Sequence, residues 1–315
     1  MPITLQPLSR RRFLAGATAG AAALALNHWT LGEASPVVDA NRVALLSDIH
    51  ISANLAEHNR SVVMANHLRD ALKAVLGAGA LPSRLFINGD CAYLHGLAGD
   101  YSAVIDLIRP VREAGVPMHL ALGNHDSREQ FWNALPADEA RSKELADHEV
   151  LDLSTPAARW IVLDSLKETS KTPGLLGEQQ LNWLSKSLDA EPAKPTIVMV
   201  HHNPVFKAPT TQPTTQPAHG LILTTGLLDS PALLDVLLRR RQVKALFFGH
   251  THAWKVSMVE GLHCVNLPAV AYVFSPEQPS GWVDARFSAS GMRLTLNTLD
   301  PAHQWNGQSH DLAWR

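Results

Sequence analysis

Short apolar runs of strand length alternate with amphipathic segments of helical period between residues 42 and 248. Several runs are apolar almost throughout, which is typical of strands buried on both faces of a sheet. The predicted strands span residues 42–47, 84–88, 118–122, 159–163, 196–200 and 243–248. The predicted helices span 61–76, 101–114, 178–188 and 231–240, and Ser230 is the expected cap of the last. This alternation predicts a layered α/β fold.

After residue 249 the pattern contains strands only, at 255–259, 262–266, 282–287 and 293–298. No linker divides the chain, so we expect one folded domain over residues 36–315. The biased segment 209–217 contains Thr-Thr-Gln-Pro twice in succession and is predicted to be an extended loop. Either a solvated insertion without a role or a lid over a site would fit it.

The N-terminus places Arg10, Arg11 and Arg12 directly before an Ala-rich apolar run of fourteen residues, 13–26. A membrane-spanning helix needs roughly twenty, so the run is interpreted as part of a secretory signal. It resembles a twin-arginine signal, which implies export of the folded protein by the twin-arginine machinery. We therefore expect a leader over residues 1–35, cleaved to start the mature chain between 26 and 37, and a periplasmic or secreted protein without a stable membrane span. An uncleaved N-terminal anchor is the alternative.

Composition narrows the functional classes. Of the 315 residues 46% are hydrophobic and 18% are charged, which suits a globular chain with a sizeable core. The net charge of -2 provides no broad basic surface for long nucleic acid. Two cysteines exclude a disulfide framework and a cysteine-built zinc site. Histidine is abundant, at 16 residues.

Histidines and carboxylates follow five of the predicted strands. The five sequences are Asp48-Ile49-His50, Gly89-Asp90, Gly123-Asn124-His125-Asp126, His201-His202-Asn203-Pro204 and Gly249-His250-Thr251-His252. Ligands of open α/β sheets bind at the carboxyl ends of strands, so these side chains are expected to converge. Asp-x-His occurs about once by chance in such a chain, whereas Gly-Asn-His-Asp and Gly-His-Thr-His are each expected only about 0.002 times.

These five motifs, in this order, resemble the signature of the calcineurin-like metallophosphoesterase family. The resemblance implies a four-layer α/β/β/α sandwich, with two central β-sheets flanked by helices and two metal ions at the strand ends. Carried over position by position, one ion would be held by Asp48, His50, Asp90 and His252. The other would be held by Asp90, Asn124, His201 and His250, so that Asp90 bridges the pair.

The ligands are oxygen and nitrogen atoms only, which suits two divalent ions among Mn, Fe, Zn, Co and Ni without choosing between them. Such a pair activates a bridging water and stabilises in-line displacement at phosphorus. His125 is then free to contact the phosphate or protonate the leaving oxygen, with Asp126 orienting its ring. A purely structural role beside the ligands is the alternative for His125.

Three further residues near these motifs need separate interpretation. His202 is an alternative to His201 as the ligand, and we favour His201 because it directly follows the strand. Tyr93 matches the Gly-Asp-x-x-Tyr segment of purple acid phosphatases, but His50 would compete for that coordination position. We therefore expect Tyr93 to be a packing or pocket residue. His95 is a candidate for substrate contact, or simply a solvated loop residue.

The predicted activity is hydrolysis of a small phosphodiester or phosphomonoester. The Asp-x-His subgroup resembles the cyclic nucleotide phosphodiesterases more than the purple phosphatases, which makes diesters reasonable substrates. A nuclease or nucleotide pyrophosphatase on the same site is one alternative. A noncatalytic phosphate-binding or sensing protein is the other, because a fold alone does not establish catalysis.

Overall fold

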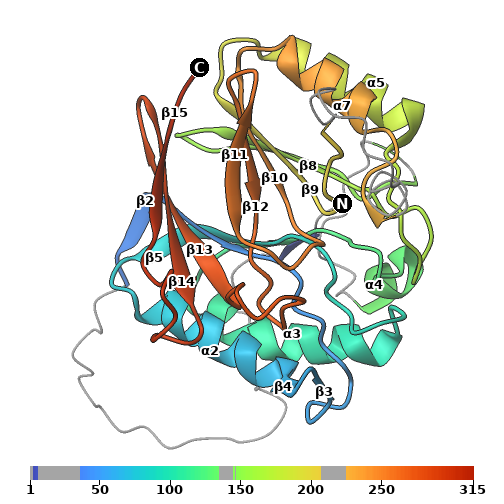
Figure 1. The fold of residues 1–315 in the computed structure, drawn as a ribbon, viewed down its shortest axis with the longest axis vertical. Coiled ribbons are helices and arrows are strands. Elements are labelled where there is room, and N and C mark those ends of the chain that lie inside the picture. The colour runs from blue at the N-terminus through green and yellow to red at the C-terminus, as the bar shows by residue number, and fades with distance from the viewer. Residues whose placement is uncertain (1–2, 6–35, 135–144, 146, 207–224) are drawn as a thin grey trace, which may run out of the picture.

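The computed structural model describes residues 3–5, 36–134, 145, 147–206 and 225–315, and two large sheets form its centre (Figure 1). The first has seven strands in the order β1-β6-β5-β2-β13-β14-β15, and the second has six in the order β11-β12-β10-β9-β8-β7. Strands β2, β5 and β6 are parallel to one another, as are β8, β9, β10 and β12. A separate hairpin consists of β3 and β4.

The bounds of the first sheet are β1 Ile3–Leu5, β2 Val38–Leu46, β5 Leu81–Ile87, β6 Met118–Leu120, β13 Gly281–Ser288, β14 Gly291–Thr298 and β15 Ser309–Ala313. Those of the second are β7 Leu151–Ser154, β8 Arg159–Leu163, β9 Thr196–Val200, β10 Val243–Phe248, β11 Lys255–Val259 and β12 Leu262–Asn266. The hairpin strands are β3 His58–Asn59 and β4 Val62–Val63. The helices are α2 Met64–Gly77, α3 Ala98–Glu113, α4 Arg128–Ala134, α5 Gly177–Ala190 and α7 Ser230–Leu238.

Helices cover the outer face of each sheet, with α2 and α3 on one side of the molecule and α5 and α7 on the other (Figure 1). Three hydrophobic clusters correspond to the three spaces between the layers. In the middle space the rings of Phe86 and Trp160 are stacked with centroids 4.6 Å apart. Burial of these apolar faces is the main force that holds the layers together. The predicted four-layer α/β/β/α sandwich is therefore confirmed.

All ten strands and four helices predicted above are present, with shifts of a few residues at their ends. The expected cap was wrong, because Ser230 is already the first residue of α7. Its hydroxyl donates to the Leu227 carbonyl at 2.5 Å and accepts the N–H of Val205 at 2.9 Å. Ser230 thus fastens the preceding loop instead of capping the helix.

The N-terminal segment is described only over β1, whose strand pairs antiparallel with β6 and whose Leu5 is fully buried. Residues 6–35, which contain the arginines and the apolar run, lie outside the described residues, as does the loop 209–217. A leader over residues 1–35 thus stays a prediction, and cleavage there would also remove β1 from the sheet edge. No helix in the described part of the chain is long and apolar enough to cross a membrane.

Candidate metal centre

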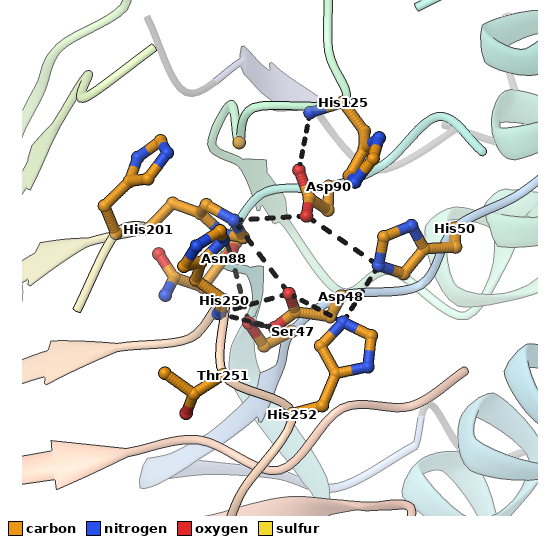
Figure 2. A network of polar contacts seen from close by, with 12 residues as sticks. Ser47, Asp48, His50, Asn88, Asp90, His125, His201, His250, Thr251 and His252 are labelled. Carbon is orange, nitrogen blue, oxygen red and sulfur yellow. Dashed lines mark hydrogen bonds and ion pairs between the residues drawn. The ribbon is translucent and has the colours of Figure 1, made fainter. Parts of the chain in front are cut away.

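The carboxyl ends of parallel strands from both sheets bring the predicted ligands together (Figure 2). Strands β2, β5 and β6 lead to the first three motifs, and β9 and β10 lead to the other two. Potential ligand atoms approach within 4.8 Å of one another in three groups, which are Asp48 with His50 and His252, His50 with Asp90 and His125, and Asp90 with His201 and His250. His50 and Asp90 each belong to two groups, so the three form one continuous cluster.

The backbone fixes three of the imidazole rings through their Nδ1 atoms. His50 Nδ1 lies 3.1 Å from the Tyr93 carbonyl, His201 Nδ1 lies 2.8 Å from the Asn88 carbonyl, and His252 Nδ1 lies 2.5 Å from the Tyr272 carbonyl. A carbonyl oxygen only accepts, so each Nδ1 must carry the proton and donate it. Whenever such a ring is neutral, it presents the lone pair of Nε2 to the cluster, which is the form that binds a metal.

The Nε2 lone pairs of His50 and His252 face each other. The Nε2 atoms of His50 and His252 lie 3.1 Å apart, and two lone pairs cannot form a hydrogen bond. His201 Nε2 also points into the cluster and lies 3.2 Å from a carboxylate oxygen of Asp90. The buried Oδ1 of Asn124 has no hydrogen-bond partner in the described structure. Buried polar atoms of this kind are costly unless a hydrogen-bond donor or a cation satisfies them, and this set of oxygen and nitrogen atoms fits metal binding.

Charge supports the same conclusion. Burial alone would raise the pKa of Asp48, but His201 and His252 lower it to about 2. Burial lowers the pKa values of His50 and His250 to about 4. The carboxylate is therefore ionised and these two imidazoles are neutral at neutral pH, as metal ligands must be.

The pKa of His201 is shifted in the opposite direction from those of His50 and His250. Burial alone would lower its pKa, but the carboxylates of Asp90 and Asp48 raise it to about 10. In a protein without cations this ring therefore carries a second proton. A divalent ion attracted by the same two carboxylates would compete with that proton, so metal binding is expected to release it.

Among the residues that the structure describes, nine non-glycine residues have positive φ, and five of these are predicted ligands: Asp48, His50, Asp90, His250 and His252. Non-glycine residues rarely adopt this region, and such conformations concentrate at functional sites. Glycine provides the space that the turns require. A Cβ on Gly123 would overlap the Asp90 carboxylate, and one on Gly249 would overlap Ser47 and Asp48. The backbone at Gly123 and at Gly249 can therefore lie directly against the ligands Asp90 and Asp48.

In the motif Gly123-Asn124-His125-Asp126, His125 lies where we expected it but Asp126 has a different role. The His125 N–H donates to Asp90 Oδ1 at 2.8 Å, and its Nδ1 lies 3.0 Å from the Leu94 carbonyl, which leaves Nε2 toward the cluster. The Asp126 carboxylate does not orient that ring. It accepts the N–H groups of Gly123, Cys91 and Ala92 and the hydroxyl of Tyr101. The expected orienting role is therefore corrected, because Asp126 fastens the loops that carry Asp90 and Asn124.

The three residues left open by the sequence lie outside the ligand groups. His202 is buried beside His201, but its Nδ1 lies 2.7 Å from the Ser165 hydroxyl and it belongs to none of the three groups. The Tyr93 hydroxyl accepts from Asn59 Nδ2 at 3.4 Å. His95 is exposed, with Nδ1 2.7 Å from Ser170 Oγ. The geometry thus favours His201 over His202 as the metal ligand. It is also consistent with Tyr93 as a packing residue.

Sequence reasoning missed the groups that hold the ligands. Ser47 donates its hydroxyl to Asp48 Oδ2 at 2.5 Å, and the Asn88 amide donates to the Val200 carbonyl at 3.1 Å. A polar residue ending an otherwise apolar strand is a signal that could have identified both. Tyr272 acts through its carbonyl, and a carbonyl is common to every residue, so no sequence signal marks it.

Comparison with known proteins adds an independent line of evidence. The model of the calcineurin-like phosphoesterase family matches residues 41–254, more than half of the chain. A "Probable cyclic nucleotide phosphodiesterase" of Rhodococcus erythropolis is 29% identical over 79% of this chain and 77% of that protein. A 3',5'-cyclic adenosine monophosphate phosphodiesterase of Vibrio vulnificus is 26% identical over 82% and 90%. A cAMP/cGMP dual specificity phosphodiesterase of Mycobacterium tuberculosis is 26% identical over 79% and 73%.

Solved structures share the fold. A dimetal phosphatase from Danio rerio has a TM-score of 0.63 at 16% identity, over 89% of this chain and all of that one. The structure of PhoD has a TM-score of 0.56 at 12% identity, over 87% of this chain and 70% of that one. The two-sheet architecture that positions the strand-end motifs is therefore common to these proteins.

Proposed function

Because the chain belongs to the calcineurin-like phosphoesterase family and is a phosphoric ester hydrolase, we propose that it uses two divalent metal ions to hydrolyse a small phosphodiester. The observation that carries this proposal is the convergence of two buried carboxylates with the facing Nε2 atoms of His50 and His252, an arrangement that a bound cation would satisfy. Relatives named as cyclic nucleotide phosphodiesterases favour a cyclic nucleotide as the diester. A phosphomonoester is the alternative substrate.

In the proposed assignment, Asp48, His50, Asp90 and His252 hold one ion. Asp90, Asn124, His201 and His250 hold the other. When bound, the ions supply Lewis acidity, a nucleophile derived from water at neutral pH and positive charge for the phosphoryl oxygens. The protein supplies the orientation, since fixed Nδ1 atoms and left-handed backbone hold the ligands in place.

His125 is the proposed acid–base group. Its ring is half-buried and lies edge-on to His50, with ring centroids 5.1 Å apart. The Leu94 carbonyl holds Nδ1, so Nε2 is the atom left to contact a phosphate oxygen or to donate a proton to the leaving oxygen. Both functions require a position beside the metal ligands, which is where His125 lies.

The test is turnover after metal reconstitution. Purified protein would be stripped with a chelator, reloaded with Mn, Fe, Zn or Co, and assayed with 3',5'-cyclic AMP, bis(p-nitrophenyl) phosphate and p-nitrophenyl phosphate. We expect metal-dependent turnover with a preference for the diesters. A monoester preference would correct the substrate class. Phosphate binding without product release, with every metal, would instead identify a noncatalytic phosphate-binding protein.

We also propose that the twin-arginine machinery exports the folded chain to the periplasm or beyond. Consecutive arginines followed by a short apolar run support this proposal. The domain that performs the chemistry would then be residues 36–315, beginning just before β2.

A further inference from the structure

One wall of the cavity above the metal cluster is aromatic. The cavity has a volume of about 360 Å³, and Tyr272 and Phe274 line it from the segment between β12 and β13. The Phe274 ring lies flat on the imidazole of His252, with centroids 4.2 Å apart and planes inclined by 18°. It is still 52% exposed. A large apolar ring thus lies exposed beside a cluster built for charge.

A guanidinium lies over this ring. The Cζ atom of Arg60 is 5.3 Å from the centroid of Phe274, within the range of a cation–π contact. Arg60 and Ser61 form the two-residue turn between β3 and β4, with φ values of 48° and 67°. Turns of this shape favour Asn and Gly, so the arginine occupies a strained position. Strain retained in a loop beside a cavity indicates that the position of its side chain matters.

The hairpin is connected to the metal cluster. Asn59 in β3 donates to the Tyr93 hydroxyl at 3.4 Å, and the Tyr93 carbonyl receives Nδ1 of His50 at 3.1 Å. Arg60 is therefore held relative to the ligands by a short chain of contacts. Within the described structure Arg60 forms no ion pair, and no lysine or arginine is among the residues that line the cavity.

The position of Arg60 over Phe274 distinguishes two possible roles of its guanidinium, which are binding an anion and stacking on a planar group. A guanidinium placed for a second anionic group would project into the cavity and keep its N–H groups directed there. Arg60 instead covers the face of an aromatic ring. Aromatic faces and planar guanidinium groups both stack on flat heterocycles. The geometry therefore favours a planar group over an anion at this end of the cavity.

We propose that Phe274 and Arg60 form a subsite for a planar nitrogen heterocycle, such as a purine base, attached to the phosphoester. The base displaces the exposed guanidinium, stacks on Phe274 and is covered on its outer face by Arg60. This inference rests on the proposed function, because the phosphate of the same ligand must lie at the metal cluster. It assigns the recognition of the organic group to residues outside the five motifs.

Calorimetry on the metal-loaded full chain tests the subsite, with adenosine 5'-monophosphate and ribose 5-phosphate as probes that differ by the base. We expect the wild type to bind the nucleotide roughly 5- to 150-fold more tightly, the range of one base–aromatic stack. Phe274→Ala should bring the ratio close to one and leave ribose 5-phosphate affinity unchanged. Phe274→Trp should retain the ratio, and Arg60→Ala should reduce it in part.

Met258→Ala, which removes another exposed apolar side chain, and Arg69→Ala are matched controls that should keep the wild-type ratio. Metal content is measured for every variant because Phe274 contacts His252. A ratio near one in the wild type, no measurable binding of either probe, or equal weakening of both probes by Phe274→Ala would overturn the subsite.

Failure of the proposed hydrolysis and failure of the subsite give different results. If the wild type hydrolyses no phosphoester with any metal but retains a base preference that depends on Phe274, hydrolysis fails and the subsite stands. If phosphoesters are hydrolysed but the base adds nothing to binding, the subsite fails and hydrolysis stands.

Discussion

Replacing Asp90 by Asn tests whether one carboxylate serves both metal positions. The side chain is 2% exposed, and its Oδ2 lies 3.2 Å from His201 Nε2 and 3.7 Å from His50 Nε2. Its Oδ1 accepts the N–H of His125. Asn keeps the size and an oxygen for that hydrogen bond, so the substitution removes charge with little change of shape.

The expected loss of metal affinity follows from the burial of Asp90. Removing one partner from a buried ion pair costs about 3–5 kcal/mol. Since about 1.4 kcal/mol is a factor of ten, the affinity of each ion that contacts Asp90 should fall by roughly 10² to 10⁴. Equilibrium dialysis followed by mass spectrometry of the metal measures this directly. We expect two ions per chain in the wild type and, under the same conditions, loss of both from Asp90→Asn.

Asp126→Asn is the matched control, because Asp126 is equally buried but belongs to no candidate metal group. It should lower stability through its lost hydrogen bonds and retain both ions. Two results would refute the reasoning. One is an Asp90→Asn protein that binds two ions with nearly unchanged affinity. The other is an Asp126→Asn protein that loses the same ions, since metal loss would then report general damage.

Three further predictions concern other parts of the chain. His125→Ala should retain both metals and slow turnover by roughly 100-fold or more; an empty metal site in this variant would make His125 a ligand. Burial and Arg84 lower the pKa of His119 to about 3. Below pH 6.5 the unfolded chain therefore binds a proton that the folded chain does not, and stability declines by about 1.4 kcal/mol per unit as pH falls toward 3. Urea unfolding at pH 7.5 and 5 should therefore show the wild type losing about 2 kcal/mol more than His119→Leu, and equal losses would contradict this. Exchange of Arg11 and Arg12 for Lys should retain the protein inside the cell in a fractionation experiment, and unchanged export would exclude the twin-arginine route.

Continuous apolar runs made the central strands predictable. β8, β9 and β10 have the bounds expected from sequence, because nearly every position in such a strand faces a packed layer and is apolar. The edge strands β7 and β15 were not predicted. Their sequences, Leu-Asp-Leu-Ser and Ser-His-Asp-Leu-Ala, are short and partly exposed. Pairing with β8 and β14 creates these strands, and that pairing depends on the assembled sheet.

For the metal cluster, the sequence predicted which residues converge but not how they are oriented. A ligand-type residue after each of five buried strands was enough to predict convergence, because ligands of α/β sheets bind at the carboxyl ends of the strands. What orients the ligands was not predictable. The carbonyls of Tyr93, Asn88 and Tyr272 that hold the three imidazoles belong to the backbone. The pair of Arg60 and Phe274 joins two loops that have no periodic pattern.

Backbone conformation explains how the ligands converge before any cation is considered. A residue in an unfavourable region of φ and ψ costs of order 1–3 kcal/mol and persists only where its surroundings determine it. At Asp48 these surroundings are its N–H bond to the Gly89 carbonyl and the Ser47 hydroxyl on its carboxylate. At His50 and His252 they are the bonds through Nδ1. The folded layers therefore sustain the strain and direct the ligands inward, so metal ions would meet an arranged site instead of having to organise the chain.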